Sequence, residues 1–156
     1  MPPLVLRVGL FVDAPIKQVR FAFEKAKLNL VQLHGHESFD YCKFLNLPYI
    51  KALHMTDDIG LHKEISSYPG SSGFLLDSFK SGLPGGTGIS FDWSRVPCGD
   101  SRLVLAGGLN HNNVKEAINK TRIGAVDVSS GIEISPGIKD PDMMKKFVRE
   151  VRRIEV

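Results

Sequence analysis

The feature that most constrains the fold is the alternation of short apolar runs with helix-patterned segments along a chain of only 156 residues. Six apolar runs, rich in β-branched residues, occupy 8–12, 30–33, 49–53, 73–77, 103–106 and 125–128. Near-continuous apolar strands are typical of parallel sheets that are buried on both faces. The alternation therefore predicts βα units of the α/β class, although a complete barrel of eight units needs about 250 residues.

The segments between the runs carry the spacing of amphipathic helices. We expect helices after Pro15 as a first helical residue, at 37–45 and 59–67, after a cap at Asn110 or Asn112, and from Asp140-Pro141 with Met144, Phe147, Val148 and Val151 on its apolar face. The segment 90–96 has room for one or two turns only. Polar and glycine residues follow the strands, where ligands of parallel α/β folds bind.

Charge and composition exclude several classes of partner. The net charge of +3 is too small and too evenly spread to indicate a nucleic-acid partner. The longest apolar run is shorter than a membrane span, and the N-terminus has no secretory pattern, so we expect no membrane association. Cys42 and Cys98 form neither a disulfide framework nor a metal site, which predicts a cytoplasmic protein with a buried Cys42 and a surface Cys98.

Two glycine-bearing turns follow the last two predicted strands. Gly107-Gly108 is the first and Ser129-Ser130-Gly131 is the second. Such turns either present backbone N–H groups to a phosphate or simply supply the positive φ of a tight turn. Because many (β/α) barrels bind phosphate after their seventh and eighth strands, the pair favours phosphate binding.

Two aspartates are placed for chemistry at strand ends. Asp77 ends an apolar strand, and burial beside apolar side chains favours the protonated carboxyl that a general acid requires. A capping or ion-paired role is the alternative for such a residue. Asp127 is expected inside a buried strand, where it needs a partner, and either orients a substrate hydroxyl or braces a neighbouring loop.

Gln32 and His34 are two residues apart, so an extended backbone places them on one face. They either contact the ligand, or His34 satisfies backbone groups of its own turn. The glycine-dense segment 82–88 lacks the features of a dinucleotide fingerprint or a P-loop. We interpret it as a mobile loop over the site, with a plain connector as the alternative.

An ordered set of motifs resembles the phosphoribosylanthranilate isomerases of tryptophan biosynthesis. The motifs, which keep the family's order and spacing from Pro2 to the C-terminus, are PPLVLRVGLFV at 2–12, VQLHG at 31–35, IKA at 50–52, LLDS at 75–78, GGTGISFDW at 85–93, LAGGLN at 105–110, VDVSSGIE at 126–133 and PGIKD at 136–140. Each motif is weak alone, but the ordered set is specific.

The resemblance implies a (β/α)₈ barrel that acts without cofactor or metal on a small phosphosugar. The implied reaction is the Amadori rearrangement of N-(5-phosphoribosyl)anthranilate to 1-(2-carboxyphenylamino)-1-deoxyribulose 5-phosphate. Asp77 would protonate the ring oxygen. Backbone N–H groups of Gly107, Gly108, Ser129, Ser130 and Gly131 would hold the phosphate, and Gln32, His34 and Asp127 would line the pocket.

One departure from the family pattern concerns the general base. The family's base is a cysteine in a Lys-Ile-Cys-Gly-like motif at the first strand, and neither that motif nor the second βα unit is present here. Residues 1–156 therefore correspond to a single partial barrel domain, the third to eighth units, with Met1 expected at an internal position of the family pattern. We expect weak activity at most, and self-association through open sheet edges.

Two rival functions remain open at the level of sequence. One is a non-catalytic phosphosugar-binding or interaction fragment that needs a partner to complete the barrel. The other is a different phosphate-binding barrel, such as indole-glycerol phosphate synthase. That reaction requires a catalytic lysine at a strand end with a carboxylate partner, and only Lys51 lies near such a position, inside its predicted strand.

Overall fold

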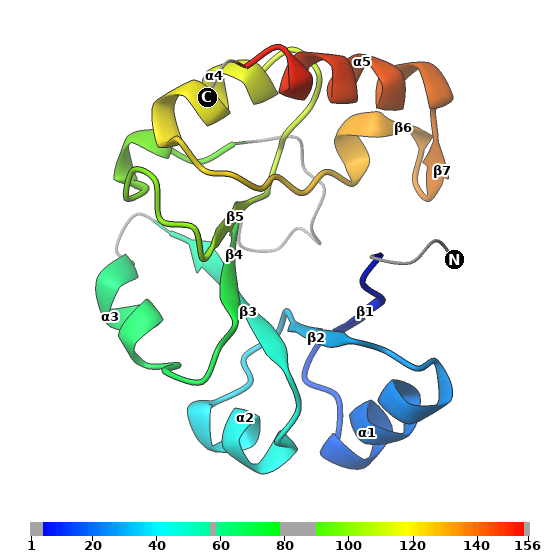
Figure 1. Ribbon diagram of the computed structural model, residues 1–156, viewed down its shortest axis with the longest axis vertical. Coiled ribbons are helices and arrows are strands. Elements are labelled where there is room, and N and C mark those ends of the chain that lie inside the picture. The colour runs from blue at the N-terminus through cyan, green and yellow to red at the C-terminus, as the bar shows by residue number, and fades with distance from the viewer. Residues whose placement is uncertain (1–4, 57–58, 79–89, 155–156) are drawn as a thin grey trace. The chain divides into compact units, whose positions relative to one another are not determined.

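The computed structural model describes residues 5–56, 59–78 and 90–154 (Figure 1). Five strands are hydrogen-bonded in chain order, and β1, β2 and β3 pair in parallel. The strands are β1 (Val8–Phe11), β2 (Leu30–Leu33), β3 (Tyr49–Met55), β4 (Gly73–Ser78) and β5 (Leu103–Leu105). The helices are α1 (Ile16–Lys25), α2 (Phe39–Leu45), α3 (Leu61–Ser66), α4 (Val114–Thr121) and α5 (Pro141–Arg152), with single turns η1 (Trp93–Arg95) and η2 (Ser130–Ile132). The predicted α/β class is confirmed.

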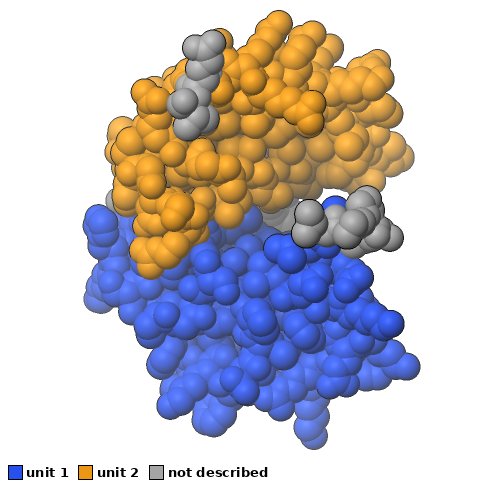
Figure 2. Space-filling view, in the orientation of Figure 1, with its two compact units in different colours: residues 1–53, 59–75 blue, residues 54–58, 76–156 orange. Residues whose placement is uncertain are grey.

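The chain forms two compact units, coloured separately in Figure 2. Unit 1 contains Met1–Leu53 and Ile59–Leu75, and unit 2 contains His54–Asp58 and Leu76–Val156. Strands β3 and β4 each contribute residues to both units. Gln32 and His34 therefore belong to unit 1, and the other predicted site residues belong to unit 2.

The core of unit 1 lies between its strands and the helices α1 and α2, which lie side by side (Figure 1). Its buried members are Val19, Val31, Leu33, Cys42, Leu45 and Tyr49. Burying each Leu or Val side chain contributes roughly 1.5–3 kcal/mol relative to exposure. The alternate residues of the edge segment, Val8, Leu10 and Val12, are 44%, 57% and 59% exposed. The expectation of burial on both faces is therefore wrong for β1.

Local sequence explains where the helices of unit 1 begin and end. Pro15 precedes α1 as its cap residue instead of occupying the first helical position. The Ser38 hydroxyl accepts a hydrogen bond from the Tyr41 backbone N–H at 3.2 Å, which satisfies a free donor at the start of α2. Asn46 ends α2 in the left-handed region at φ 50°, a conformation that asparagine adopts more easily than most residues.

In unit 2, the turn after β5 pairs with β4 through the Ala106 backbone N–H, which donates to the Leu76 carbonyl at 2.8 Å. Helices α4 and α5 lie side by side (Figure 1). The Asp140 carboxylate caps α5 by accepting from the Asp142 and Met143 backbone N–H groups at 2.7 and 3.1 Å, as predicted. Of the predicted apolar face of α5, Phe147 is buried, whereas Met144 and Val148 are exposed.

The sixth predicted strand, 125–128, is wrong. The structure has a single parallel bridge there, between Leu105 and Val126, and Ala125 and Asp127 on either side are exposed. Two backbone hydrogen bonds join this segment to β5: the Leu105 N–H donates to the Ala125 carbonyl at 3.0 Å, and the Asp127 N–H donates to the Leu105 carbonyl at 2.8 Å. Two hydrogen bonds make a bridge and not a ladder, so this segment lies beside β5 without forming a strand.

Smaller differences concern helix caps and a hairpin. Asn113, and neither Asn110 nor Asn112, is the cap residue of α4. An unpredicted antiparallel pair, β6 (Glu133–Ser135) and β7 (Ile138–Lys139), follows η2. The single turn η1 agrees with the one or two turns expected at 90–96. Across the described ranges, no helix is both long and apolar enough to cross a membrane.

Candidate active site

The carboxyl end of β4 carries the predicted general acid. Gly73–Leu76 are fully buried, and the strand leaves the core at Asp77 and Ser78, which are half-buried. A Cβ atom added to Gly107 would lie 2.2 Å from the Ser78 backbone nitrogen and 2.5 Å from its Oγ. The turn after β5 therefore packs directly on the residue that follows Asp77, and only glycine permits that approach.

The Gly107-Gly108 turn is held in one conformation by its backbone and by Asn113. Gly107 and Gly108 have φ values of 74° and 67°, which L-residues rarely adopt. The Asn113 amide donates to the Gly108 carbonyl at 2.9 Å, and its Oδ1 accepts from the Asn110 backbone N–H at 2.8 Å. Sequence reasoning missed Asn113, because three polar residues precede the helix and any of them fits a cap.

The second predicted phosphate turn packs against the first. A Cβ atom added to Gly131 would lie 1.8 Å from the Leu109 carbonyl oxygen and 3.1 Å from the Asn110 Cα. Both contacts are to backbone, which cannot rotate away as a side chain can. Ser130 and Gly131 are half-buried in η2. Unit 2 thus brings the two glycine turns together beside the end of β4, as the sequence predicts.

Ser129 is exposed and is tied down by Lys139. The Lys139 ammonium donates to the Ser129 carbonyl at 3.0 Å, to its Oγ at 3.1 Å and to the Glu133 carboxylate at 2.6 Å. The hydrogen bond from Lys139 holds the pKa of Glu133 below its usual value. Lys139 was not among the predicted site residues, although it lies within the PGIKD motif.

Asp127 differs from its prediction. It was expected inside a buried strand, but its side chain is exposed and its segment is not a strand. Its backbone N–H still pairs with Leu105, so it lies at the carboxyl end of the bridge that continues β5. A role in lining the pocket therefore remains a prediction without the support of burial.

In unit 1, Gln32 and His34 lie on one face, as their spacing predicts. The Gln32 Nε2 lies 3.0 Å from the His34 Nδ1, and because an amide nitrogen can only donate, the imidazole Nδ1 accepts. Both side chains are half-buried. The neighbouring Gly35 is buried, and a Cβ atom there would lie 2.4 Å from the Asp13 Oδ1.

The two cysteines and Lys51 do not supply an open nucleophile. Cys42 is buried in α2, where desolvation raises the pKa of its thiol, and Cys98 is exposed in a loop, both as predicted. Lys51 is only 3% exposed. Glu37 supplies the carboxylate partner that the alternative requires, but Lys51 is the third residue of β3 and its ammonium also donates to carbonyl oxygens, which disfavours a reactive lysine at a strand end.

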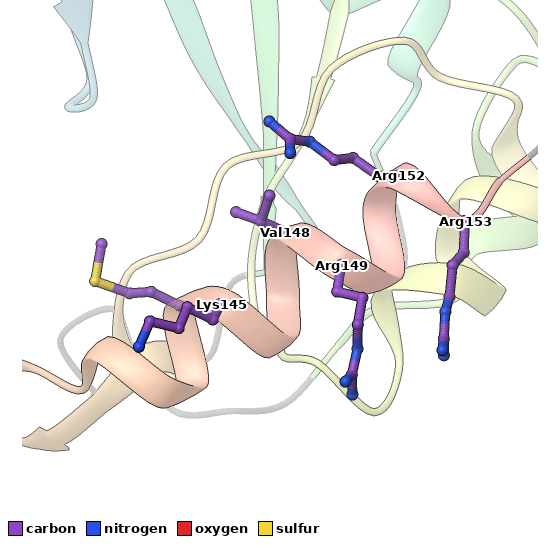
Figure 3. Close-up of a pocket in the computed structure, with 6 residues that line it drawn as sticks. Lys145, Val148, Arg149, Arg152 and Arg153 are labelled. Atoms are coloured by element: carbon purple, nitrogen blue, oxygen red, sulfur yellow. The ribbon is translucent and has the colours of Figure 1, made fainter.

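A groove lies along α5 in unit 2. Met144, Lys145, Val148, Arg149, Arg152 and Arg153 line it (Figure 3). It contains none of the nine residues predicted for catalysis or binding. The glycine-dense segment 82–88, interpreted from sequence as a loop over the site, lies outside the described residues.

Comparison with solved structures establishes the class of protein first. The crystal structure of phosphoribosyl anthranilate isomerase from Thermotoga maritima matches with a TM-score of 0.86 at 36% identity, covering 99% of this chain and 76% of that one. A second isomerase structure, in complex with reduced 1-(o-carboxyphenylamino)-1-deoxyribulose 5-phosphate, matches with a TM-score of 0.79 at 34% identity, covering 99% and 75%. The chain thus has the fold of a TIM-barrel enzyme.

Sequence comparison then gives the family. The profile of N-(5'-phosphoribosyl)anthranilate (PRA) isomerase matches residues 2–150. The isomerase of Chromohalobacter salexigens is 49% identical over 97% of this chain and 71% of its own length. That of Nitrosomonas eutropha is 47% identical over 99% and 75%. The chain belongs to the phosphoribosylanthranilate isomerase family, the isomerases of tryptophan biosynthesis, and spans about three quarters of these relatives.

Proposed function

We propose that this chain carries the phosphate-binding and acid half of an aldose–ketose isomerase site, which acts on N-(5-phosphoribosyl)anthranilate. One observation carries the proposal. The turn of Gly107 packs against Ser78, the residue next to Asp77, and the turn of Gly131 packs against the Gly107 turn. When these turns hold the phosphate of a phosphosugar, the Asp77 carboxyl group therefore lies close enough to reach the sugar ring.

The proposed chemistry is an Amadori rearrangement. Asp77, as general acid, gives a proton to the ring oxygen, and the bond between that oxygen and the anomeric carbon breaks to leave an iminium. A base then removes the proton from the neighbouring carbon, and the electron pair of that C–H bond neutralises the iminium to give the enol-amine, which tautomerises to the amino-ketose. Backbone N–H groups of Gly107, Gly108, Ser129, Ser130 and Gly131 hold the phosphate.

The substrate-lining roles of Gln32, His34 and Asp127 belong to the same proposal. The Gln32–His34 hydrogen bond supports a shared role for these two side chains, because it fixes their directions together. Asp127 would act at a more exposed place than expected. We further propose that 1–156 works as one partial barrel domain in the cytoplasm.

The expected activity of the chain by itself is low. The resemblance gives the family's general base as a cysteine at a strand end, and neither Cys42 nor Cys98 lies at one. A positioned proton-transfer group contributes roughly 10²–10⁴-fold to rate. We therefore expect turnover reduced by about that factor relative to a form with the base.

The test compares two proteins and an Asp77→Asn variant of the second. The first protein is this chain, and the second is this chain preceded by the N-terminal segment of the Chromohalobacter salexigens relative. Asp77→Asn in the extended form should lower turnover of phosphoribosylanthranilate by about a hundredfold or more. Near-normal turnover of that variant, with unchanged circular dichroism, would refute the general-acid role.

A non-catalytic binding or interaction fragment is the second candidate, favoured by the exposed strand β1. Its side chains Val8 and Leu10 are 44% and 57% exposed, and an uncovered strand edge of this kind pairs readily with another chain. The isomerase of Thermotoga maritima is described as dimeric. Tight binding of the reduced product analogue without turnover, together with dimers in sedimentation, would favour this candidate over the enzyme.

A further inference from the structure

A buried ion pair lies beside the carboxyl end of β2, where Lys51 of β3 is in register with Leu33, and it is outside the proposed chemistry. The Lys51 Nζ of β3 lies 3.2 Å from the Glu37 Oε2. The side chains of Lys51 and Glu37 are only 4% and 1% exposed. Two charges removed from water in this way are costly unless further hydrogen bonds satisfy them. The partners of the pair therefore show what the charges stabilise.

On one side, Lys51 gathers the backbone around the end of β2. Its ammonium donates to the Gly35 carbonyl at 2.6 Å, to the Ala52 carbonyl at 3.2 Å and to the Leu33 carbonyl at 3.3 Å. Together with Glu37 these acceptors outnumber its three protons, so the group is fully engaged. Lys51 thus restrains the backbone on both sides of His34, at Leu33 and Gly35.

On the other side, Glu37 joins the turn after β1 to the turn after β2. Its Oε1 accepts from the Asp13 backbone N–H at 2.9 Å, and its Oε2 accepts from the Gly35 backbone N–H at 3.0 Å. The Asp13 Oδ1 accepts in turn from the His36 backbone N–H at 2.6 Å. Asp13 itself has φ 48°, a strained conformation that persists only where its surroundings fix it.

These contacts converge on the segment that carries His34. The His34 backbone N–H donates to the Phe11 carbonyl at 2.8 Å, and Gly35 is held by Lys51 and Glu37 together. The Tyr68 hydroxyl donates to the Glu37 carbonyl at 3.0 Å and closes the other end of the segment. Every residue from 33 to 37 thus has its backbone bonded to this network or to β1.

We propose that Glu37 and Lys51 are positioning residues, which fix the 34–37 turn and thereby the orientation of the His34 and Gln32 side chains, the two substrate-lining residues of the proposed function. The pair does not touch the substrate. It restricts the turns after β1 and β2 through buried hydrogen bonds to charged groups, which are stronger than hydrogen bonds between neutral groups. This inference rests on the proposed function for the identity of the ligand, but not for the ordering of the turn.

The test of ordering uses Glu37→Gln, which keeps the shape of the side chain and removes its charge. Lys51→Met is the second variant. Leu45→Ala is the matched control, because Leu45 is fully buried in the same unit and makes no hydrogen bond to the turn through its side chain. Hydrogen exchange at the Asp13, Gly35 and His36 amides should accelerate by about tenfold or more in Glu37→Gln, and the His34 ring signals should shift. Leu45→Ala should leave both unchanged relative to the rest of the unit.

The test of function is the affinity of the full chain for reduced 1-(o-carboxyphenylamino)-1-deoxyribulose 5-phosphate by calorimetry. Glu37→Gln should weaken binding by about tenfold, and Leu45→Ala should not change it at a temperature where both are folded. Equal affinity of Glu37→Gln and the parent, or equal exchange rates at Gly35, would overturn the proposal. Failure of the parent to bind would instead refute the proposed function, and the exchange data would still decide whether the pair orders the turn.

Discussion

Replacing Gly107 by alanine tests the close approach on which the site depends. Gly107 and Gly99 share a φ of 74°, so alanine meets the same backbone strain of about 1–2 kcal/mol at either position. At Gly99 an added Cβ meets nothing within 4 Å, whereas at Gly107 it lies 2.2 Å from the Ser78 nitrogen. The difference between the two variants therefore isolates the packing of the phosphate turn on β4.

The expected difference follows from the cost of forcing backbone apart. Overpacking of a close contact costs about 1–3 kcal/mol. Gly107→Ala should therefore unfold more easily than Gly99→Ala by that amount, which corresponds to a melting temperature lower by about 2–4 °C for each kcal/mol. It should also weaken binding of inorganic phosphate and of the product analogue, while Gly99→Ala binds as the parent does.

Thermal and urea unfolding, followed by circular dichroism, measure the stability difference, and calorimetry measures the affinity. The parent, Gly99→Ala and Gly107→Ala are compared under one set of conditions. Equal stability of the two variants would show that the turn can move away from Ser78 at no cost. In that event the rigid placement of the turn beside Asp77 would be refuted.

Three further predictions concern other parts of the chain. Iodoacetamide at neutral pH should modify the exposed Cys98 and spare Cys42, because burial raises the pKa of the Cys42 thiol. Mass spectrometry measures the labelling, and equal labelling of both cysteines in the folded chain would contradict the burial of Cys42 in α2. Lys139 lowers the pKa of Glu133 in the folded state, so the stability that this pair contributes is present above the unfolded pKa of Glu133 and is lost as the pH falls through the folded pKa. The melting temperature of the parent should therefore decline more steeply at acidic pH than that of Lys139→Ala. Parallel profiles of melting temperature against pH would refute the stabilising role of the pair. Leu10→Lys, at an exposed position of the edge strand β1, should reduce any self-association measured by sedimentation, whereas Lys145→Glu on α5 should not. An unchanged association constant for Leu10→Lys would exclude β1 as the interface.

Much of the fold follows from local sequence because the relevant forces are local. The apolar run at Gly73–Leu76 predicts a strand buried on both faces, and all four residues are buried in β4. Asp140 followed by Pro141 predicts the start of α5, because the carboxylate satisfies the free N–H groups of the first turn. The spacing of Gln32 and His34 predicts their shared face because side chains two residues apart in extended backbone point to the same side.

The sequence-based predictions fail where the local structure depends on contacts between residues far apart in the chain. The run 125–128 has the apolar character of a strand, but it pairs with β5 through a single bridge, which local sequence does not indicate. Asp127 is exposed beside that bridge. Glu37 and Lys51 lie 14 residues apart, so nothing in either local pattern indicates that they meet. Gly107 and Gly131 were identified as turns, but their packing on Ser78 and Leu109 is a tertiary contact that only the structure shows.

The central claim is that the two glycine turns beside Asp77 hold the phosphate of a phosphosugar. Titration of the ¹⁵N-labelled chain with reduced 1-(o-carboxyphenylamino)-1-deoxyribulose 5-phosphate tests it most directly. The account predicts the largest amide shifts at Gly107, Gly108, Ser130 and Gly131, all of which vanish in Gly107→Ala but persist in Gly99→Ala. Saturable shifts confined to the basic groove of α5, with these glycines unmoved, would contradict it.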